Sequence, residues 1–114
     1  RQRKVEILCK GESVPIPVQS LAWIESQGRE QYLHLVGGCR EQLITRLTIT
    51  QLEDLLVPHG FLRIHKSYLV NMAYLQSFQS TSAVLTIGQT LPVGARSYRD
   101  NKQKFVRWQA QQLW

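Results

Sequence analysis

The feature that most constrains the fold of this chain is its division into short β-type runs by turn-forming residues. Residues 4–10, 21–25, 32–36 and 41–46 are rich in apolar and β-branched side chains, and glycine or polar clusters separate these runs. The segment 26–30 between two of them is polar and contains a glycine. This pattern predicts short antiparallel strands joined by tight turns, with residues 26–30 forming a hairpin loop.

The second half of the chain continues this β pattern. Its apolar runs predict four further strands, at 61–70, 74–78, 84–87 and 91–93. The last two strands are expected to form a hairpin. Alternation puts Leu85 and Ile87 on one face of its first strand, and they are expected to lie opposite apolar residues of the second. Those partners are Leu91 and Val93.

Two segments have a helical rather than a β period. The first is short and carries leucines at helical spacing, at positions 52, 55 and 56. Thr50 precedes them and Glu53 follows it three residues later, which is the pattern of a capping box. The sequence Pro58-His59-Gly60 is expected to end this helix after about two turns.

The second helical segment lies at the C-terminal end. Residues 96–113 contain no helix breaker, and Tyr98, Phe105 and Trp108 fall on one side of the predicted helix. No repeat or linker divides the chain, so residues 1–114 are expected to form one domain. Apolar residues make up 43% of the chain, which is enough for a core. The expected fold is mainly β, with antiparallel sheets, one short internal helix and a C-terminal helix.

The positive charge is concentrated in the second half of the chain. Residues 1–60 contain seven basic and seven acidic residues, whereas residues 61–114 contain seven basic residues and a single acid, Asp100. The net charge of +6 therefore belongs to the second half. A basic surface attracts polyanions, of which nucleic acid is the commonest and an anionic membrane the next. A solvated helix face at the C-terminus is the structural alternative.

The residue types needed for catalysis or metal binding do not form a recognisable group. His34, His59 and His65 are far apart, and the chain has no H-E-x-x-H motif, no nucleophile elbow and no P-loop. Cys9 and Cys39 form no C-x-x-C pair. We therefore expect no enzyme activity, no metal and no cofactor, and reduced cysteines in the cytoplasm. A disulfide between the two cysteines stays an alternative.

The segment from Phe61 to Asn71, F-L-R-I-H-K-S-Y-L-V-N, is the most informative part of the sequence. One parity holds the apolar residues Leu62, Ile64, Tyr68 and Val70, and the other holds the polar residues Arg63, His65, Ser67 and Asn71. Lys66 falls on the apolar parity, so the alternation breaks at the His65-Lys66 step. A bulge or loop there would turn Lys66 away from the core and toward a ligand. Arg63, His65 and Asn71 are instead expected to satisfy polar groups and a turn within the fold.

This segment resembles the F-x-R-x-H-R/K-S-Y/F-x-V-N pattern of the LytTR family of bacterial DNA-binding domains. A leucine-containing helix precedes it and L-P-V-G-A-R-S-Y follows it at 91–98, as in that family. The earlier sequence L-A-W-I-E-S at 21–26 is similar to the family's I-x-Y-I-E-A/S strand, with Trp23 at the aromatic position. The resemblance covers about residues 4–107.

The resemblance implies a fold of antiparallel sheets that binds DNA through loops instead of a recognition helix. Domains of this family typically end the response regulators of bacterial two-component systems, after a receiver domain, and bind direct repeats in promoters. We therefore expect sequence-specific binding to double-stranded DNA in transcription regulation, in the cytoplasm and without a membrane partner. Since the chain begins with Arg1 rather than Met, a receiver or sensor domain is expected to precede it in a longer protein. Self-association on DNA stays open.

The same resemblance assigns three places to the major groove of DNA. The first is the hairpin after the I-E-S strand, matched here by Arg29, Glu30 and Gln31. Arg29 and Gln31 are retained as candidates, whereas the negative charge of Glu30 is unfavourable near DNA. The second place follows the motif histidine and is matched by Lys66, and the third follows the last strand and is matched by Arg96.

The residues themselves support two of these places. The broken alternation described above predicts that Lys66 points away from the core. Arg96 precedes the predicted C-terminal helix, where backbone N–H groups also favour a phosphate, and an arginine there can bind guanine with two hydrogen bonds. Arg99 is a further candidate for a phosphate contact. The structural alternative for Arg96 is an ion pair with Asp100.

Two other functions fit the same sequence features. One is a protein-interaction module that sequesters a partner regulator, which would bind DNA weakly and without regard to sequence. The other is an RNA or anionic-lipid binder that uses the same basic surface, which competition with duplex DNA would distinguish. Trp23 and Trp108 have apolar neighbours and are expected in the core, so they do not favour single-strand binding by base stacking.

Overall fold

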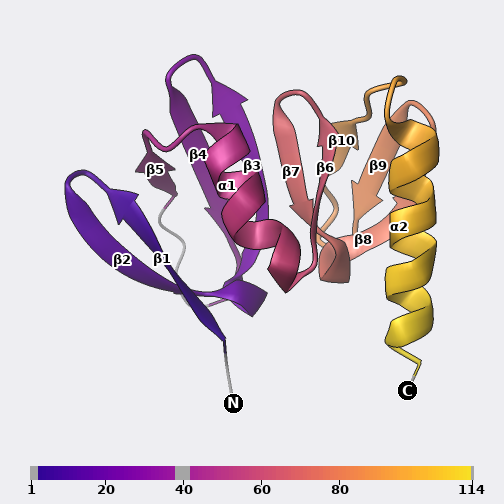
Figure 1. Cartoon of the computed structure of the whole chain (residues 1–114), viewed down its shortest axis with the longest axis horizontal. Helices are drawn as coiled ribbons and strands as arrows, with labels where there is room; N and C mark the ends of the chain where they lie inside the picture. The colour runs from indigo at the N-terminus through magenta and orange to yellow at the C-terminus, as the bar shows by residue number, and fades with distance from the viewer. Residues whose placement is uncertain (1–2, 38–41, 114) are drawn as a thin grey trace.

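The computed structural model of the chain describes residues 3–37 and 42–113. Within these residues it contains ten β-strands, two α-helices and three short 3-10 helices (Figure 1). The strands are β1 Lys4–Cys9, β2 Glu12–Pro17, β3 Leu21–Gln27, β4 Glu30–Leu35, β5 Leu43–Thr45, β6 Phe61–His65, β7 Tyr68–Asn71, β8 Leu75–Phe78, β9 Ser82–Leu85 and β10 Thr90–Pro92. The α-helices are α1 Ile49–Leu56 and α2 Tyr98–Gln111, and the 3-10 helices are η1 Val18–Ser20, η2 Val57–His59 and η3 Met72–Tyr74.

The strands form three antiparallel sheets. The central sheet has the order β5-β4-β3-β7-β6, a separate hairpin pairs β1 with β2, and the third sheet has the order β10-β9-β8. In Figure 1 the β1–β2 hairpin and α2 lie at opposite ends of the molecule, with the central sheet between them. The mainly β, antiparallel fold with a short internal helix and a C-terminal helix is therefore confirmed.

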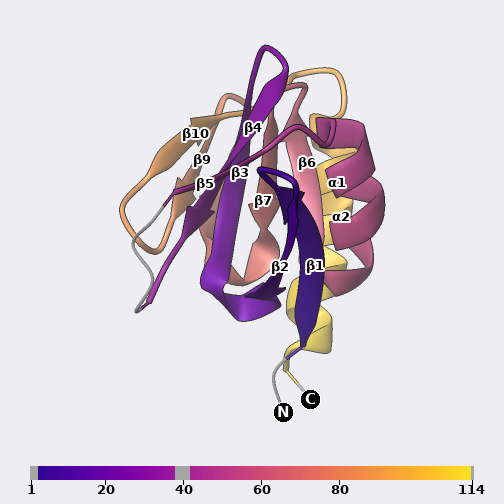
Figure 2. The same cartoon turned by 90° about the vertical axis from the view of Figure 1, so that its left-hand side faces the viewer.

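The central sheet is buried on both faces because consecutive residues of its strands contribute to different cores. Leu69 packs in a core with α1 and the β1–β2 hairpin, whereas Val70 packs in a core with the third sheet and α2. Phe61 and Leu62 are divided in the same way. Figure 2 shows α1 and α2 along the same side of the molecule. The two helices therefore run beside the central sheet and leave β6 between them.

The short helix α1 begins earlier than the capping pattern around Thr50 predicts. Its N-cap is Thr48, whose Oγ1 accepts from the Gln51 N–H at 3.0 Å, while the Gln51 side chain accepts from the Thr48 N–H at 2.8 Å. Two overlapping sequences fit a capping box, Thr48 to Gln51 and Thr50 to Glu53. The helix uses the first, which makes Ile49 a helical residue and buries it. Because Glu53 is not needed as a cap, its carboxylate is available to another element.

Residues 61–70 form a hairpin and not the single strand predicted. Strand β6 ends at His65 and β7 begins at Tyr68, so Lys66 and Ser67 make the turn. The pairing register also shifts between Arg63 and His65. The break in alternation seen in the sequence is thus confirmed, and its cause is a reversal of the chain.

The predicted pairing of the last two strands is also corrected. Leu91 of β10 pairs with Ala83 of β9, and Thr90 pairs with Val84. Ile87 lies in the turn between these strands and is 47% exposed. The run of strand-forming residues 84–87 continues past Leu85, where β9 ends. The alternation along this run therefore could not show where the turn begins.

The C-terminal helix follows the prediction more closely. Tyr98, Phe105 and Trp108 pack against the core that contains the third sheet. Helix α2 begins at Tyr98, so Arg96 lies in the turn that leads into it. Among the described residues, neither helix is long and apolar enough to cross a membrane.

Candidate nucleic-acid interface

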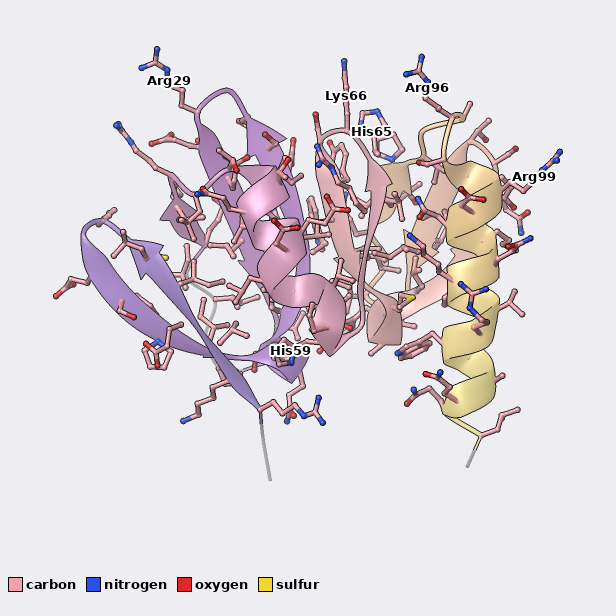
Figure 3. The ribbon with its side chains drawn as sticks, in the orientation of Figure 1. Arg29, His59, His65, Lys66, Arg96 and Arg99 are labelled. Carbon is pink, nitrogen blue, oxygen red and sulfur yellow. The ribbon has the colours of Figure 1, made fainter. Side chains whose placement is uncertain are left out.

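Three exposed basic side chains project from one edge of the molecule. Arg29 lies at the β3–β4 turn, Lys66 at the β6–β7 turn and Arg96 before α2, and Figure 3 shows all three pointing outward at the top of the view. Arg99 projects from the side of α2, and His59 lies near the opposite end of the molecule. The fold therefore brings together three of the predicted residues that are far apart in sequence.

The β6–β7 turn, which carries Lys66, is held by side-chain hydrogen bonds. The Arg63 guanidinium donates to the Lys66 carbonyl at 2.6 Å and to the Glu53 carboxylate at 3.1 Å. The His65 Nδ1 accepts from the Ser67 N–H at 3.1 Å. Lys66 therefore extends from a backbone whose position is fixed before any ligand arrives.

Two more bonds connect this turn to its neighbours. The Ser67 carbonyl accepts from the Ser26 N–H at 2.8 Å, which joins the β6–β7 turn to β3. The Asn101 side chain donates to the Arg63 carbonyl at 2.7 Å, which joins β6 to α2. Hydrogen bonds thus connect the β6–β7 hairpin to β3 on one side and to the start of α2 on the other.

The other polar residues of the motif have structural roles, as expected from the sequence. Asn71 is buried, and its Nδ2 donates to the carbonyls of Leu21 at 3.0 Å and Val18 at 3.3 Å. Its Oδ1 accepts from the Ala73 N–H at 3.0 Å and so starts the 3-10 helix η3. The motif asparagine therefore connects β7 to the segment before β3.

Gln31 does not lie in the hairpin loop where the resemblance placed it. It belongs to β4, opposite Thr45 of β5, and only 3% of its surface is exposed. Its Oε1 is buried without a hydrogen-bond partner. The β3–β4 turn is shorter than predicted because Gly28 adopts a φ of +62°, which closes the hairpin tightly and draws Gln31 into the sheet.

Arg46 is a basic residue at this edge that the sequence interpretation missed. Arg29 and Arg46 are both exposed, and they line one hollow of about 450 Å³ together with Gln31 and Thr48. Arg46 lies two residues before the N-cap of α1. A basic residue in the turn before a capping box would have indicated this position. Because the sequence pattern places the cap at Thr50 instead of Thr48, it does not show that Arg46 lies in the turn before the helix.

Arg96 faces Lys66 across a second hollow. This hollow has a volume of about 590 Å³ and is lined by residues of the β6–β7 turn and of the segment that precedes α2. The Gly94 N–H donates to the Ile64 carbonyl at 2.8 Å, which fixes that segment against β6. Within the described residues, Arg63 forms an ion pair with Glu53 and the His34 ring lies 4.0 Å from the Glu25 carboxylate, whereas the alternative pairing of Arg96 with Asp100 is not formed.

An aromatic stack supports the β3–β4 hairpin from behind. The rings of Trp23 and His34 are 3.6 Å apart between centroids and nearly parallel, and the Tyr68 ring also stacks with Trp23, with the centroids 6.0 Å apart. Burial lowers the pKa of His34, and the nearby Glu25 carboxylate opposes that shift. Trp23 is only 6% exposed, so it packs in the core as expected and offers no platform for a base.

No group of three or more potential metal ligands occurs among the described residues. Cys9 is a buried free thiol, and burial raises its pKa. Cys39, its potential disulfide partner in the sequence interpretation, lies outside the described residues. The chemistry present at the described edge is therefore that of basic and amide side chains and backbone N–H groups.

Comparison with known proteins gives one family. The model of the LytTR family, the LytTr DNA-binding domain, matches residues 11–105. Among solved structures, the LytTr DNA-binding domain of a protein described as a methyl-accepting/DNA response regulator from Bacillus cereus is similar, with a TM-score of 0.71 and 20% identity. That match covers 93% of this chain and 98% of the other, and it concerns the fold. No curated protein matches the chain.

Proposed function

The chain belongs to the LytTR family of DNA-binding domains, and we propose that it reads double-stranded DNA in a sequence-specific manner through the three basic loops of one edge. The observation that carries this proposal is the common direction of Arg29, Lys66 and Arg96 (Figure 3). They come from three separate turns, and nothing in the packing of the core requires a basic residue at all three.

The proposed mechanism divides the work between base edges and phosphates. Lys66 and Arg96 enter the major groove, which is about 12 Å wide and presents a distinct set of donors and acceptors for each base pair. Both side chains are donors without acceptors, which suits the O6 and N7 atoms of guanine. Arg29, Arg46 and Arg99 bind phosphates on either side and set the position of the domain on the duplex.

Selection of binding sites from a random duplex pool tests this proposal. We expect one sequence motif to become enriched, and its affinity to fall as salt rises with a log–log slope of about −3 to −6, for some four to six phosphate contacts per monomer. A pool without an enriched sequence would contradict base readout. Tight binding to a partner regulator in its place would support the interaction module.

The biological setting forms a second part of the proposal. We propose that the domain is the output part of a bacterial response regulator, that a receiver or sensor domain belongs to the same protein, and that it acts in the cytoplasm. Two copies would bind direct repeats in a promoter. A selected motif that appears twice with a fixed spacing, and cooperative binding to that double site, would support the repeat; a single unrepeated site would contradict it.

A further inference from the structure

A basic groove runs from the proposed DNA edge to the opposite end of the molecule. The hollow at Lys66 and Arg96 shares its lining residues Arg63, Asn101 and Lys104 with a second hollow of about 640 Å³ between α1 and α2. That second hollow shares Arg3, His59 and Trp108 with a third, of about 330 Å³. The second and third hollows are called the helix groove below. Arg3, the first described residue, and Gln112, which follows α2, line both of these hollows.

The charge of the helix groove is positive and uncompensated. Arg3, Lys104 and Arg107 line it and are exposed. Among the described residues that line it, Glu53 is the single acid, and it already pairs with Arg63 at 3.1 Å. An anionic ligand would therefore find three unneutralised cations in the groove.

The helix groove is lined by both polar and apolar side chains. Its accessible apolar residues include Val57 and Pro58, which follow α1 and are exposed, and the half-buried Trp108 of α2, whereas Leu62 and Met72 are almost completely buried. The Nδ1 of His59 is buried here without a hydrogen-bond partner. Accessible apolar side chains beside exposed cations fit a ligand that is acidic and apolar together.

Duplex DNA held at the loop edge does not extend into this groove. Arg107 lies nine residues beyond Tyr98, the first residue of α2, which places it about 14 Å down the helix axis from that edge. The groove also lies between two helices, and a duplex is too wide to enter such a space. The cations of its far half are thus left for another partner.

The shape of the groove favours an extended chain over a small molecule. Small-molecule sites enclose about 70–90% of their ligand, whereas this groove continues into a neighbouring hollow at its upper end and reaches the end of the molecule at the other. Among the described residues it presents one indole, not the row of aromatic platforms that binds single-stranded nucleic acid. Grooves beside helices commonly receive a peptide whose apolar side chains serve as anchors.

We propose that the helix groove binds an acidic peptide segment with apolar anchor residues from a partner protein, while the loop edge holds DNA. Lys104 and Arg107 neutralise the acids, and the channel between Val57 and Trp108 takes an anchor. The domain then connects a DNA site at one end to a protein at the other, which is an activity separate from DNA recognition.

The test uses the 114-residue domain and a fluorescein-labelled peptide of about 12 residues in which Glu and Asp alternate with Leu and Phe. We expect saturable binding by fluorescence anisotropy, and a tenfold or greater loss for R107E and for K104E. The matched control is R99E, which reverses the same charge on the same helix outside the groove and should change peptide affinity by less than about twofold. V57D should also weaken binding, since it adds an acid to the opposite wall.

Two further measurements separate the proposal from its rivals. R107E should keep its affinity for selected duplex DNA within about twofold, and the peptide should bind equally well to the DNA complex. The proposal is overturned if the peptide shows no saturable binding, if R99E weakens it as much as R107E, or if DNA displaces it. Binding of single-stranded RNA in place of the peptide, with the same loss in R107E, would also overturn it. Because DNA affinity is measured independently, failure here leaves the DNA proposal standing.

Discussion

The two hairpin turns at the loop edge carry similar basic residues but are held in different ways. The β6–β7 turn is braced by Arg63 and His65 and bonded to Ser26 of the neighbouring strand. The β3–β4 turn depends on the positive φ of Gly28 for its shape, and a stack of rings supports the hairpin behind it. The β6–β7 turn is therefore organised before binding, whereas Arg29 on the β3–β4 turn is expected to lose more conformational entropy when it binds DNA.

The largest effect is expected from removal of the brace itself. R63A loses hydrogen bonds to the Lys66 carbonyl, Glu53 and Thr50, so we expect the free energy of unfolding to fall by about 2–3 kcal/mol, discounted for partial solvent exposure. Urea denaturation measures this change. The matched control is K66A, which removes a cation three residues away and should change stability by less than about 0.5 kcal/mol. Equal stability of R63A and the parent would show that the brace is not needed.

The second prediction compares the two turns directly in DNA binding. K66A should weaken binding to a selected duplex by about 1–3 kcal/mol, the range for a lost base contact. R29A should weaken binding less, by about 1 kcal/mol, because ordering this exposed, long side chain on DNA offsets about 0.5–1.5 kcal/mol of the contact energy. Anisotropy titrations at one fixed salt concentration measure both. A larger loss of DNA-binding free energy in R29A than in K66A would contradict the proposed difference between the two turns.

The difference between the turns also marks what the sequence could predict. Lys66 was placed correctly because a break in alternation is a local signal that survives in the fold. Gln31 was misplaced because the length of a hairpin turn depends on one glycine dihedral angle, and a shift of one residue moves a side chain between loop and sheet. The cap at Thr48 shows the same limit, since two overlapping patterns compete and only the burial of Ile49 decides between them.

Other parts of the edge depend on contacts that no local pattern contains. Arg63 pairs with Glu53 across ten residues, and Asn101 reaches the Arg63 carbonyl across 38. Such partners are set by the packing of α1 and α2 beside β6. The motif therefore identified the family and an exposed cation at a turn, Lys66, while the hydrogen-bond network that holds this turn could be seen only in the fold.

The third prediction concerns the buried amide beneath the β3–β4 turn. Q31M replaces an unpartnered buried oxygen with an apolar group of similar length, so we expect stability to rise by about 1 kcal/mol. DNA affinity should stay within about twofold, since only 3% of the Gln31 surface is exposed to a ligand. Urea denaturation and DNA titration of the same preparation measure the two quantities. A large loss of DNA affinity would mean that Gln31 leaves the sheet to read a base.

The smallest effect is expected from pH, and it should act on the β3–β4 hairpin alone. Burial lowers the pKa of His34 in the folded chain, so the unfolded chain, where histidine titrates near pH 6.5, binds more protons as the pH falls. The stabilising contribution of His34 is therefore complete above about pH 6.5 and is lost as the pH falls through the folded pKa. The attraction of Glu25, 4.0 Å away, limits the loss.

Amide hydrogen exchange should show faster opening of β3 and β4 at low pH while β6 and β7 keep their protection, and H34F should remove the difference. Equal acceleration in both hairpins would mean that the stack does not hold the β3–β4 hairpin separately.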